Sequence, residues 1–185
     1  QFNFLMKIGS KTLFGREHNL FQGITYNEFK NRVPIRDYEQ FKHYIERVKN
    51  GESNILWPGR PIYFALTSGT TSGSKYIPIT KESLKNHLNG AKNAILNYVA
   101  QTKKTSFIKG KFIFIQGSPL LDKMSKILIG RLSGISAHHI PFYMRAKMLP
   151  SWKTNIIEDW ETKLERIVDE TIDKDMTIIS GIPSW

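Results

Sequence analysis

The clearest pattern along the chain is the helical spacing of its apolar residues, which return every three or four positions in several segments. In one of them, Thr80 is a candidate N-cap, and a stripe from Leu84 to Val99 predicts a face that packs on the core. Thr25 and Glu28 have the spacing of a capping box, and Pro34 ends the segment that follows. The helices expected from this pattern cover residues 2–12, 25–33, 37–48, 80–99 and 155–172.

Short apolar and β-branched runs predict strands between these helices, at 62–66, 111–115 and 176–180. Residues 121–132 are apolar at mixed spacing and predict a helix or an irregular segment, and residues 137–142 predict a short strand. This alternation is typical of an α/β fold with a mostly parallel sheet flanked by helices. Because parallel strands present their carboxyl ends at one edge, the loops that follow the three main strands are expected to line one crevice.

Composition adds limits on the class of protein. The chain has 185 residues, enough for one domain or one large lobe with a core, and its 40% hydrophobic and 23% charged residues are ordinary for a globular protein. It contains no cysteine, which excludes a disulfide scaffold and a thiolate metal site. Its apolar runs are too short to span a bilayer, and the N-terminus lacks the pattern of a signal peptide, so we expect a cytoplasmic protein with no membrane partner.

The formal net charge of +11, from 27 basic and 16 acidic side chains, raises nucleic acid as a partner. The lysines are spread along most of the chain, however, and form no arginine-rich run. A solvated, lysine-rich surface is therefore the favoured interpretation, and a basic nucleic-acid-binding module is kept as an alternative.

The bend after the first predicted strand concentrates hydroxyls, two glycines and one cation. We expect it to join that strand to the helix that follows Thr80. Glycine lets the backbone take left-handed conformations and approach a phosphate closely, hydroxyls add hydrogen bonds, and lysine supplies a point charge. A surface linker would share this composition, but it need not begin at the end of a buried strand. The residues expected to bind the phosphates of a nucleotide are Thr67, Ser68, Gly69, Thr70, Thr71, Ser72, Gly73 and Lys75.

The order of residues in this bend is informative. It is not a Walker A loop, because Ser74 separates Gly73 from Lys75 and Tyr76 follows the lysine. The order T-S-G-T-T-x-G-x-K resembles the phosphate loop of the adenylate-forming superfamily, whose usual form is T-S-G-T-T-G-x-P-K. This chain has Ser72 where glycine is usual and Ser74 where proline is usual.

Further motifs around the loop narrow the resemblance to one branch. With these motifs the chain is similar to the auxin-responsive-promoter family of acyl-acid amido synthetases, in its bacterial form, over residues 14–185. Such enzymes are several hundred residues long, so residues 1–185 are expected to be a truncated part of the large N-terminal adenylate-forming domain. The motifs are Phe14-Gly15-Arg16-Glu17, Val33-Pro34-Ile35, Leu56-Trp57-Pro58, Lys75-Tyr76-Ile77-Pro78-Ile79-Thr80 and Ser180-Gly181-Ile182-Pro183-Ser184-Trp185.

The resemblance implies an ATP- and Mg²⁺-dependent ligase that forms an acyl-adenylate from a carboxylic acid and transfers the acyl group to an amine such as an amino acid. Lys75 is then the expected catalytic residue, acting on the phosphates. The acyl substrate is expected near Ser118, Ser180, Gly181 and Trp185. In the family's pattern the adenine and ribose contacts follow Trp185, so the fragment alone is expected to be inactive. A nucleotide-binding protein without catalysis is a second alternative.

No metal site is expected from the side chains. His138 and His139 form the only histidine pair, and adjacent residues in an extended segment point to opposite faces, which is poor geometry for one ion. A structural role is the favoured interpretation for both.

Overall fold

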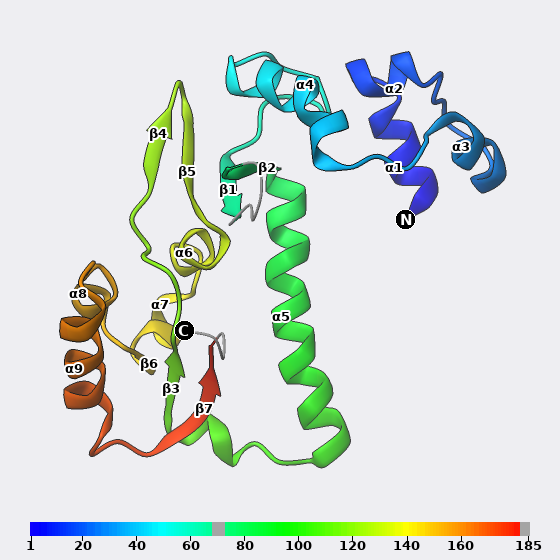
Figure 1. Ribbon diagram of the computed structural model, residues 1–185. Helices are drawn as coiled ribbons and strands as arrows, with labels where there is room; N and C mark the ends of the chain where they lie inside the picture. Colours follow the sequence, from blue (N-terminus) through cyan, green and yellow to red (C-terminus); the bar gives the residue numbers. More distant parts are fainter. Residues whose placement is uncertain (68–72, 182–185) are drawn as a thin grey trace. The chain divides into compact units, whose positions relative to one another are not determined.

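The computed structural model describes residues 1–67 and 73–181 (Figure 1). The chain divides into two compact units, which we call the N-terminal unit (residues 1–83 and 122–129) and the C-terminal unit (residues 84–121 and 130–185). Both contain helices and strands, so the predicted α/β class is confirmed.

Three helices of the N-terminal unit begin where the sequence supplies a cap, after Thr12, Thr25 and Asp37. Thr25 and Glu28 form the predicted capping box, and Asp37 and Gln40 form a second one, in which each side chain accepts a hydrogen bond from the other residue's backbone N–H. The Thr12 hydroxyl accepts a hydrogen bond from the N–H of Gly15 (3.0 Å). The predicted helices of this region are confirmed, and an additional short one is present. They are α1 (Phe2–Gly9), α2 (Leu13–Glu17), α3 (Tyr26–Arg32) and α4 (Tyr38–Lys49).

The N-terminal unit also contains a four-stranded sheet. Two of its strands come from residues 1–83, and β4 and most of β5 come from residues 122–129. Its order is β2-β1-β5-β4, and β1–β2 and β4–β5 are antiparallel pairs. Two expectations are corrected here. The bend after β1 leads to a second strand rather than directly to a helix, and residues 121–132 form mainly a hairpin. The strands are β1 (Tyr63–Thr67), β2 (Lys75–Ile79), β4 (Asp122–Met124) and β5 (Ile127–Arg131).

One face of this sheet packs on α4. Phe64 of β1 is fully buried, and it joins α4 residues and β5 residues in one cluster. Tyr76 of β2 packs at the margin of the same cluster, with its ring edge-on to Phe64 at a centroid distance of 5.9 Å. The buried members are Tyr44, Ile45, Val48, Ile55, Phe64, Ile127 and Ile129. This packing fixes α4 along the hairpin formed by β1 and β2.

The long helix α5 (Lys81–Thr102) begins after Thr80, whose hydroxyl accepts a hydrogen bond from the N–H of Ser83 (3.1 Å). The predicted cap is therefore present. Leu84 is buried, but Ile95 is 37% exposed and Tyr98 is 47% exposed. The prediction of a continuous buried stripe is therefore wrong for the C-terminal half of α5, where these two side chains are exposed.

The C-terminal unit holds a parallel sheet of order β6-β3-β7, which confirms the expected parallel arrangement in this part of the chain. Its strands are β3 (Lys111–Phe114), β6 (Met148–Leu149) and β7 (Met176–Ser180), and a short 3-10 helix, η1 (Ser106–Lys109), precedes β3. The helices are α6 (Leu132–Ala137), α7 (Phe142–Arg145), α8 (Trp152–Asn155) and α9 (Trp160–Thr171).

Two boundaries in this unit differ from prediction. The strand expected at 137–142 is absent, because α6 ends at Ala137 and α7 begins at Phe142. The last helix begins at Trp160 rather than Asn155, because the Asp159 carboxylate accepts a hydrogen bond from the N–H of Thr162 (2.9 Å) and starts the helix there.

Polar groups join α8 to α9. The Glu170 carboxylate accepts hydrogen bonds from the N–H of Ser151 (2.5 Å), the hydroxyl of Ser151 (2.7 Å) and the hydroxyl of Thr154 (2.6 Å). Burial alone would raise the pKa of Glu170, but these hydrogen bonds outweigh it and hold the pKa below its ordinary value. Lys163 is buried, donates to the carbonyl oxygen of Asn155 (2.9 Å), and has its pKa lowered by burial.

Candidate functional site

The β1–β2 hairpin holds the two ends of the predicted phosphate loop together. Thr67 and Lys75 are Cα partners, the last pair of the antiparallel ladder before the loop. Gly73 has φ +84°, the left-handed conformation that the sequence predicts for a glycine of this loop, and no atom of the described residues lies within 4 Å of where its Cβ would be. Five predicted phosphate-binding residues lie outside the described residues, namely Ser68, Gly69, Thr70, Thr71 and Ser72.

Lys75 is half-buried at the start of β2. Its Nζ lies 5.6 Å from the centroid of the Tyr38 ring. None of the ion pairs found between described residues involves Lys75. Within this part of the chain the ammonium group therefore contacts an aromatic face and has no ion-pair partner, an arrangement suited to receiving an anion.

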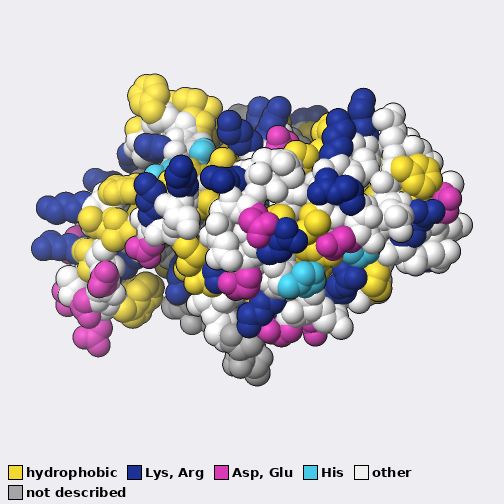
Figure 2. Space-filling model, turned by 90° about the horizontal axis from the view of Figure 1, so that it is seen from above, with side chains coloured by type: hydrophobic (Ala, Val, Ile, Leu, Met, Phe, Trp, Pro, Cys, Tyr) yellow, Lys and Arg dark blue, Asp and Glu magenta, His cyan; other side chains and the backbone are white. Residues whose placement is uncertain are grey.

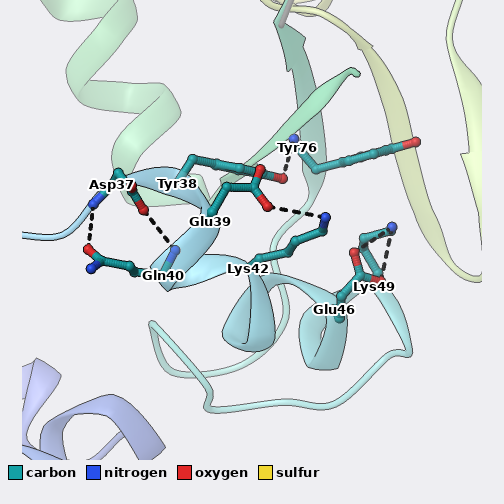
Figure 3. Close-up of polar contacts among 8 residues, drawn as sticks. All are labelled: Asp37, Tyr38, Glu39, Gln40, Lys42, Glu46, Lys49 and Tyr76. Carbon is teal, nitrogen blue, oxygen red and sulfur yellow. Dashed lines mark hydrogen bonds and ion pairs between the residues drawn. The ribbon is translucent and has the colours of Figure 1, made fainter. Parts of the chain in front are cut away.

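Tyr38 makes a second contact with the same strand. Its hydroxyl oxygen accepts a hydrogen bond from the backbone N–H of Tyr76 (2.8 Å), the residue next to Lys75 (Figure 3). In the described sheet β2 is an edge strand, and this bond satisfies one of its outward backbone groups.

The remaining dashed contacts in Figure 3 lie within α4 and its N-cap. The reciprocal hydrogen bonds of Asp37 (to Gln40 N–H, 2.9 Å) and Gln40 (to Asp37 N–H, 3.0 Å) fix the first turn, where Tyr38 lies. At the other end of α4, Nζ of Lys49 lies 4.4 Å from the centroid of the Tyr76 ring and pairs with Glu46 (2.9 Å). Both ends of α4 thus contact Tyr76, since Tyr38 bonds to its backbone N–H and Lys49 lies against its ring.

Three of the four predicted acyl-site residues are described, and all belong to the C-terminal unit. Ser180 pairs with Phe114 across β7 and β3, and its carbonyl oxygen accepts a hydrogen bond from the N–H of Ile115 (2.9 Å). Gly181 follows directly, and a Cβ on it would lie 3.2 Å from Cβ of Ile115. The structure therefore places Ser180 and Gly181 beside the end of β3, as the topology predicts.

Ser118 lies in the turn after β3, where its hydroxyl accepts a hydrogen bond from the N–H of Leu120 (3.3 Å). A Cβ on Gly134 of α6 would lie 2.5 Å from the carbonyl oxygen of Ser118, so α6 packs closely on this turn. Trp185 lies outside the described residues. The single crevice is expected from the sequence because the three main strands would share one mostly parallel sheet. That expectation of one sheet is wrong, since β1 belongs to the sheet β2-β1-β5-β4 and β3 and β7 belong to the sheet β6-β3-β7. The crevice itself stays a prediction.

His138 has the structural role that the sequence favoured. Its Nε2 hydrogen-bonds to the carbonyl oxygen of Pro119 (2.8 Å), and its ring meets the Trp152 ring edge-on at a centroid distance of 4.9 Å. Across residues 1–67 and 73–181 there is no group of three or more His, Asp or Glu side chains that could hold a metal ion.

Sequence reasoning missed Tyr38 as a site residue. In the sequence it is one member of the apolar stripe of residues 37–48, and no local signal shows that its hydroxyl reaches a strand 38 residues away. It also missed the contact between Glu17 and Tyr44, in which the Tyr44 hydroxyl donates to the Glu17 carboxylate. Burial, followed by the neighbouring Glu17, raises the pKa of Tyr44.

The basic side chains do not form one stripe on the face drawn in Figure 2, where Lys and Arg are interspersed with acidic and uncharged side chains. None of the helices in the described part of the chain is both long enough and apolar enough to cross a bilayer.

The fold is thus an α/β arrangement in which a loop rich in hydroxyls and glycine connects two antiparallel strands beside a capped helix. The sequence pattern of the GH3 family N-terminal domain matches residues 2–182, and the chain belongs to this family.

Curated relatives match shorter segments. The indole-3-acetic acid-amido synthetase GH3.15 of Arabidopsis thaliana is 45% identical over 62 residues, which cover 32% of this chain and 10% of the relative. The probable indole-3-acetic acid-amido synthetase GH3.13 of Oryza sativa subsp. japonica is 48% identical over 58 residues, or 30% of this chain and 12% of the relative. The jasmonoyl-L-amino acid synthetase JAR4 of Nicotiana attenuata is 31% identical over 93 residues, which cover 49% of this chain and 16% of the relative.

A solved structure of the GH3.15 acyl acid amido synthetase superposes with a TM-score of 0.66 at 17% identity, covering 88% of this chain and 28% of that chain. A second solved structure, of the Arabidopsis GH3.15 enzyme in complex with 2,4-DB, gives a TM-score of 0.54 at 20% identity. It covers 74% of this chain and 23% of that chain. These likenesses show the fold. The chain matches less than a third of the length of each of these proteins.

Proposed function

We propose that the chain is the N-terminal part of a ligase that uses ATP to activate a carboxylic acid as an acyl-adenylate and then transfers the acyl group to an amine. The observation that carries this proposal is the position of Lys75. In a chain of the GH3 family, its ammonium group stands at the end of a loop rich in hydroxyls and glycine, with no ion-pair partner among the described residues.

The proposed reaction has two steps. A carboxylate oxygen of the acid attacks the α-phosphorus of ATP, the bond to the β-phosphate oxygen breaks, and pyrophosphate leaves. The amine nitrogen then attacks the carbonyl carbon of the acyl-adenylate, the bond to the AMP oxygen breaks, and the nitrogen loses a proton to give the amide. The protein's part is to align two anions and to stabilise the charge that builds on the phosphates.

Lys75 and the loop supply this stabilisation in our proposal. Thr67, Ser68, Gly69, Thr70, Thr71, Ser72 and Gly73 offer backbone N–H groups and hydroxyls to the phosphates, and Lys75 offers its charge. The left-handed conformation of Gly73 supports this assignment, because such a conformation turns successive N–H groups toward one concavity. Mg²⁺ would enter with the phosphates of ATP, which are its usual ligands together with one or two carboxylates, and would neutralise part of their charge.

We assign the acid to the region of Ser118, Ser180, Gly181 and Trp185. The meeting of Ser180 and Gly181 with the end of β3 supports this choice, because ligands of parallel sheets bind at the carboxyl ends of strands. Relatives are named for conjugating indole-3-acetic acid or for making jasmonoyl-amino acids, which supports a small-molecule acid and an amino acid as the substrates.

Three further features belong to the proposal. Residues 1–185 alone are inactive, since the parent ligase is longer, as the partial coverage of relatives supports. The protein works in the cytoplasm, where ATP is available. It comes from the bacterial branch of the family, which rests on the order of its motifs, while the relatives reported above are plant proteins.

The net charge of +11 supports a different candidate, a basic module that binds nucleic acid. The salt dependence of binding distinguishes this candidate from the ligase. A nucleic-acid-binding module would bind DNA or RNA with an affinity that falls steeply as the salt concentration rises and that does not depend on ATP. A nucleotide-binding protein without catalysis would bind ATP and form no product.

The test is to incubate the full-length parent protein with ATP, Mg²⁺, a panel of aryl, fatty and keto acids, and amino acids, and to detect products by mass spectrometry. The proposal expects an amide and AMP in equal amounts with at least one acid. ATP consumption that yields no amide with any pair, from folded protein, would contradict it.

A further inference from the structure

We propose that Tyr38 is a positioning residue for Lys75, whose aromatic ring holds the ammonium group at the phosphate end of the β1–β2 hairpin without neutralising it. This inference rests on the proposed function, because it assigns Tyr38 a role in the same reaction.

The geometry fits a cation–π contact. The distance of 5.6 Å from Nζ of Lys75 to the centroid of the Tyr38 ring lies within the range of about 6 Å over which a ring face attracts a cation. A carboxylate in the same place would bind the ammonium more strongly, but it would cancel the charge and would repel an incoming phosphate. An aromatic ring restrains the lysine and leaves its charge available.

The ring itself is held in place from two directions. The capping box of Asp37 and Gln40 fixes the first turn of α4, which carries Tyr38. The Tyr38 hydroxyl is bound by the N–H of Tyr76 (2.8 Å). One side chain thus contacts the ammonium group of Lys75 and the backbone of the next residue, so the position of the ring is tied to the strand that carries the lysine.

Lys75 needs such a restraint because the core does not supply one. Tyr76 packs toward Phe64 in the core cluster, whereas the Lys75 ammonium reaches the ring of Tyr38 at the margin of that cluster. A lysine on its four-carbon stem has large rotamer freedom, and ordering it costs free energy. Contact with Tyr38 removes part of that freedom before ATP binds, which is what preorganised charge stabilisation requires.

The expected effect follows from the strength of the contact. Cation–π contacts contribute about 0.5 to 2 kcal/mol, which corresponds to roughly a twofold to thirtyfold change in rate. We expect Tyr38→Leu to lower kcat/KM for ATP by this factor, in the same kinetic parameter that Lys75→Met lowers. Tyr38→Phe keeps the ring and loses only the hydrogen bond to Tyr76, so it should retain most of the activity.

A double-mutant cycle in the full-length protein tests this. Acid-dependent pyrophosphate exchange is measured for wild type, Tyr38→Leu, Lys75→Met and the double variant, at a temperature at which thermal unfolding shows all four to be folded. If Tyr38 acts through Lys75, the Tyr38→Leu change has little further effect once Lys75 is Met. Independent, additive losses would overturn the proposal, as would a Tyr38→Phe variant as impaired as Tyr38→Leu.

Lys49→Met is the matched control. It removes the other contact between a lysine and an aromatic ring on this helix–strand pair, the 4.4 Å contact with Tyr76, at the opposite end of α4. We expect it to leave the exchange rate within about twofold of wild type, whereas a loss equal to that of Tyr38→Leu would show a general effect of loosening α4 and would overturn the specific role.

A spectroscopic measurement separates this inference from the proposed function. A ring face near Nζ shifts the NMR signals of the Lys75 ε-methylene protons upfield, and Tyr38→Leu should abolish the shift. Absence of the shift in wild type overturns the inference even if the enzyme is active. Absence of all exchange by wild type, with the shift present, contradicts the proposed function instead.

Discussion

Thr67 and Lys75 are paired across β1 and β2, so the lysine is carried by a hydrogen-bonded strand and not by the loop itself. Its backbone position is therefore set by the sheet, while the residues between 67 and 75 close the hairpin. In the proposed function this arrangement separates two roles that the sequence presents as one motif, a cation carried by a strand and hydrogen-bond donors in the residues that precede it.

Replacing Lys75 by Ala in the full-length protein should weaken transition-state binding by about 2 to 4 kcal/mol, the scale of losing one preorganised charge-stabilising group. The order of preference among acids should not change, because the acid is assigned to another region. The measurement is kcat/KM for ATP and for several acids. Lys42→Ala is the control, since the Lys42 side chain is 51% exposed on α4 and its one ion pair with a described residue is a surface pair with Glu39.

A reordering of acid preference by Lys75→Ala, with ATP dependence intact, would place Lys75 in the acyl pocket and contradict the assignment. An effect of Lys42→Ala as large as that of Lys75→Ala would indicate a general response to lost charge.

Gly73→Val should impair pyrophosphate exchange, because a β-branched residue is strained at φ +84° and would change the path of the loop. The strain costs roughly 1 to 2 kcal/mol. Gly51→Val is the matched control: Gly51 has φ +88°, open space around it and a place after the end of α4. Both changes should lower the melting temperature, but only the change at Gly73 should reduce exchange by folded protein. Equal losses of exchange would remove any special role for Gly73.

The sequence predicted three helix starts correctly, because each cap and its hydrogen bond lie within four residues. Thr25, Asp37 and Thr80 begin helices where the pattern predicts them. It did not predict β2, since the segment contains Pro78 and no clear alternation. Pro78 is tolerated because β2 is an edge strand in the described sheet, where a missing N–H is harmless.

Long-range contacts explain the other differences. The β4–β5 hairpin turns at Ser125, which takes φ +56° without an Asn-Gly signal, and both strands are fixed by pairing rather than by local preference. For the site, the loop could be located from sequence, whereas the contact of Tyr38 with Lys75 depends on α4 packing against β2 and has no local signature.

Gly15→Ala should destabilise the protein by roughly 1 to 3 kcal/mol, the usual cost of overpacking. A Cβ there would lie 2.0 Å from the carbonyl oxygen of Gly9 and 2.8 Å from Cα of Ser10, both backbone atoms that cannot move aside without displacing α1. This gives a structural reason for the glycine in the Phe14-Gly15-Arg16-Glu17 motif. Denaturant unfolding of wild type and Gly15→Ala measures this loss of unfolding free energy.

Gly90→Ala is the control for that experiment. Gly90 lies within α5 and a Cβ on it would contact nothing within 4 Å, so the change should stabilise the helix by about 0.5 to 1 kcal/mol. A neutral Gly15→Ala change would mean that α1 and α2 do not pack as described.

Glu170→Gln should cost about 1 to 3 kcal/mol at neutral pH, because a charged acceptor of three hydrogen bonds is replaced by a neutral one. The pKa of Glu170 is held below the ordinary value of 4.5 in the folded state. Its contribution is therefore fully present above about pH 4.5 and is lost as the pH falls through the lowered folded-state pKa. The difference in unfolding free energy between wild type and variant should shrink over that range.

Unfolding of wild type, Glu170→Gln and Glu165→Gln at pH 7 and at several values below pH 4.5 checks this. Glu165 is exposed on the same helix, so its change should be nearly neutral at every pH. A Glu170→Gln difference that stays constant as the pH falls would contradict the role of the ionised carboxylate.

The central claim is that the parent protein activates a carboxylate by adenylation at the loop that Lys75 ends. Acid-dependent exchange of labelled pyrophosphate into ATP measures this half-reaction directly, without an amine. For folded full-length protein we predict exchange that requires Mg²⁺ and at least one member of a panel of aryl, fatty and keto acids, and that falls by roughly 30- to 900-fold in Lys75→Ala, the equivalent of about 2 to 4 kcal/mol. No exchange above background with any acid, or exchange unchanged in Lys75→Ala, would contradict the account.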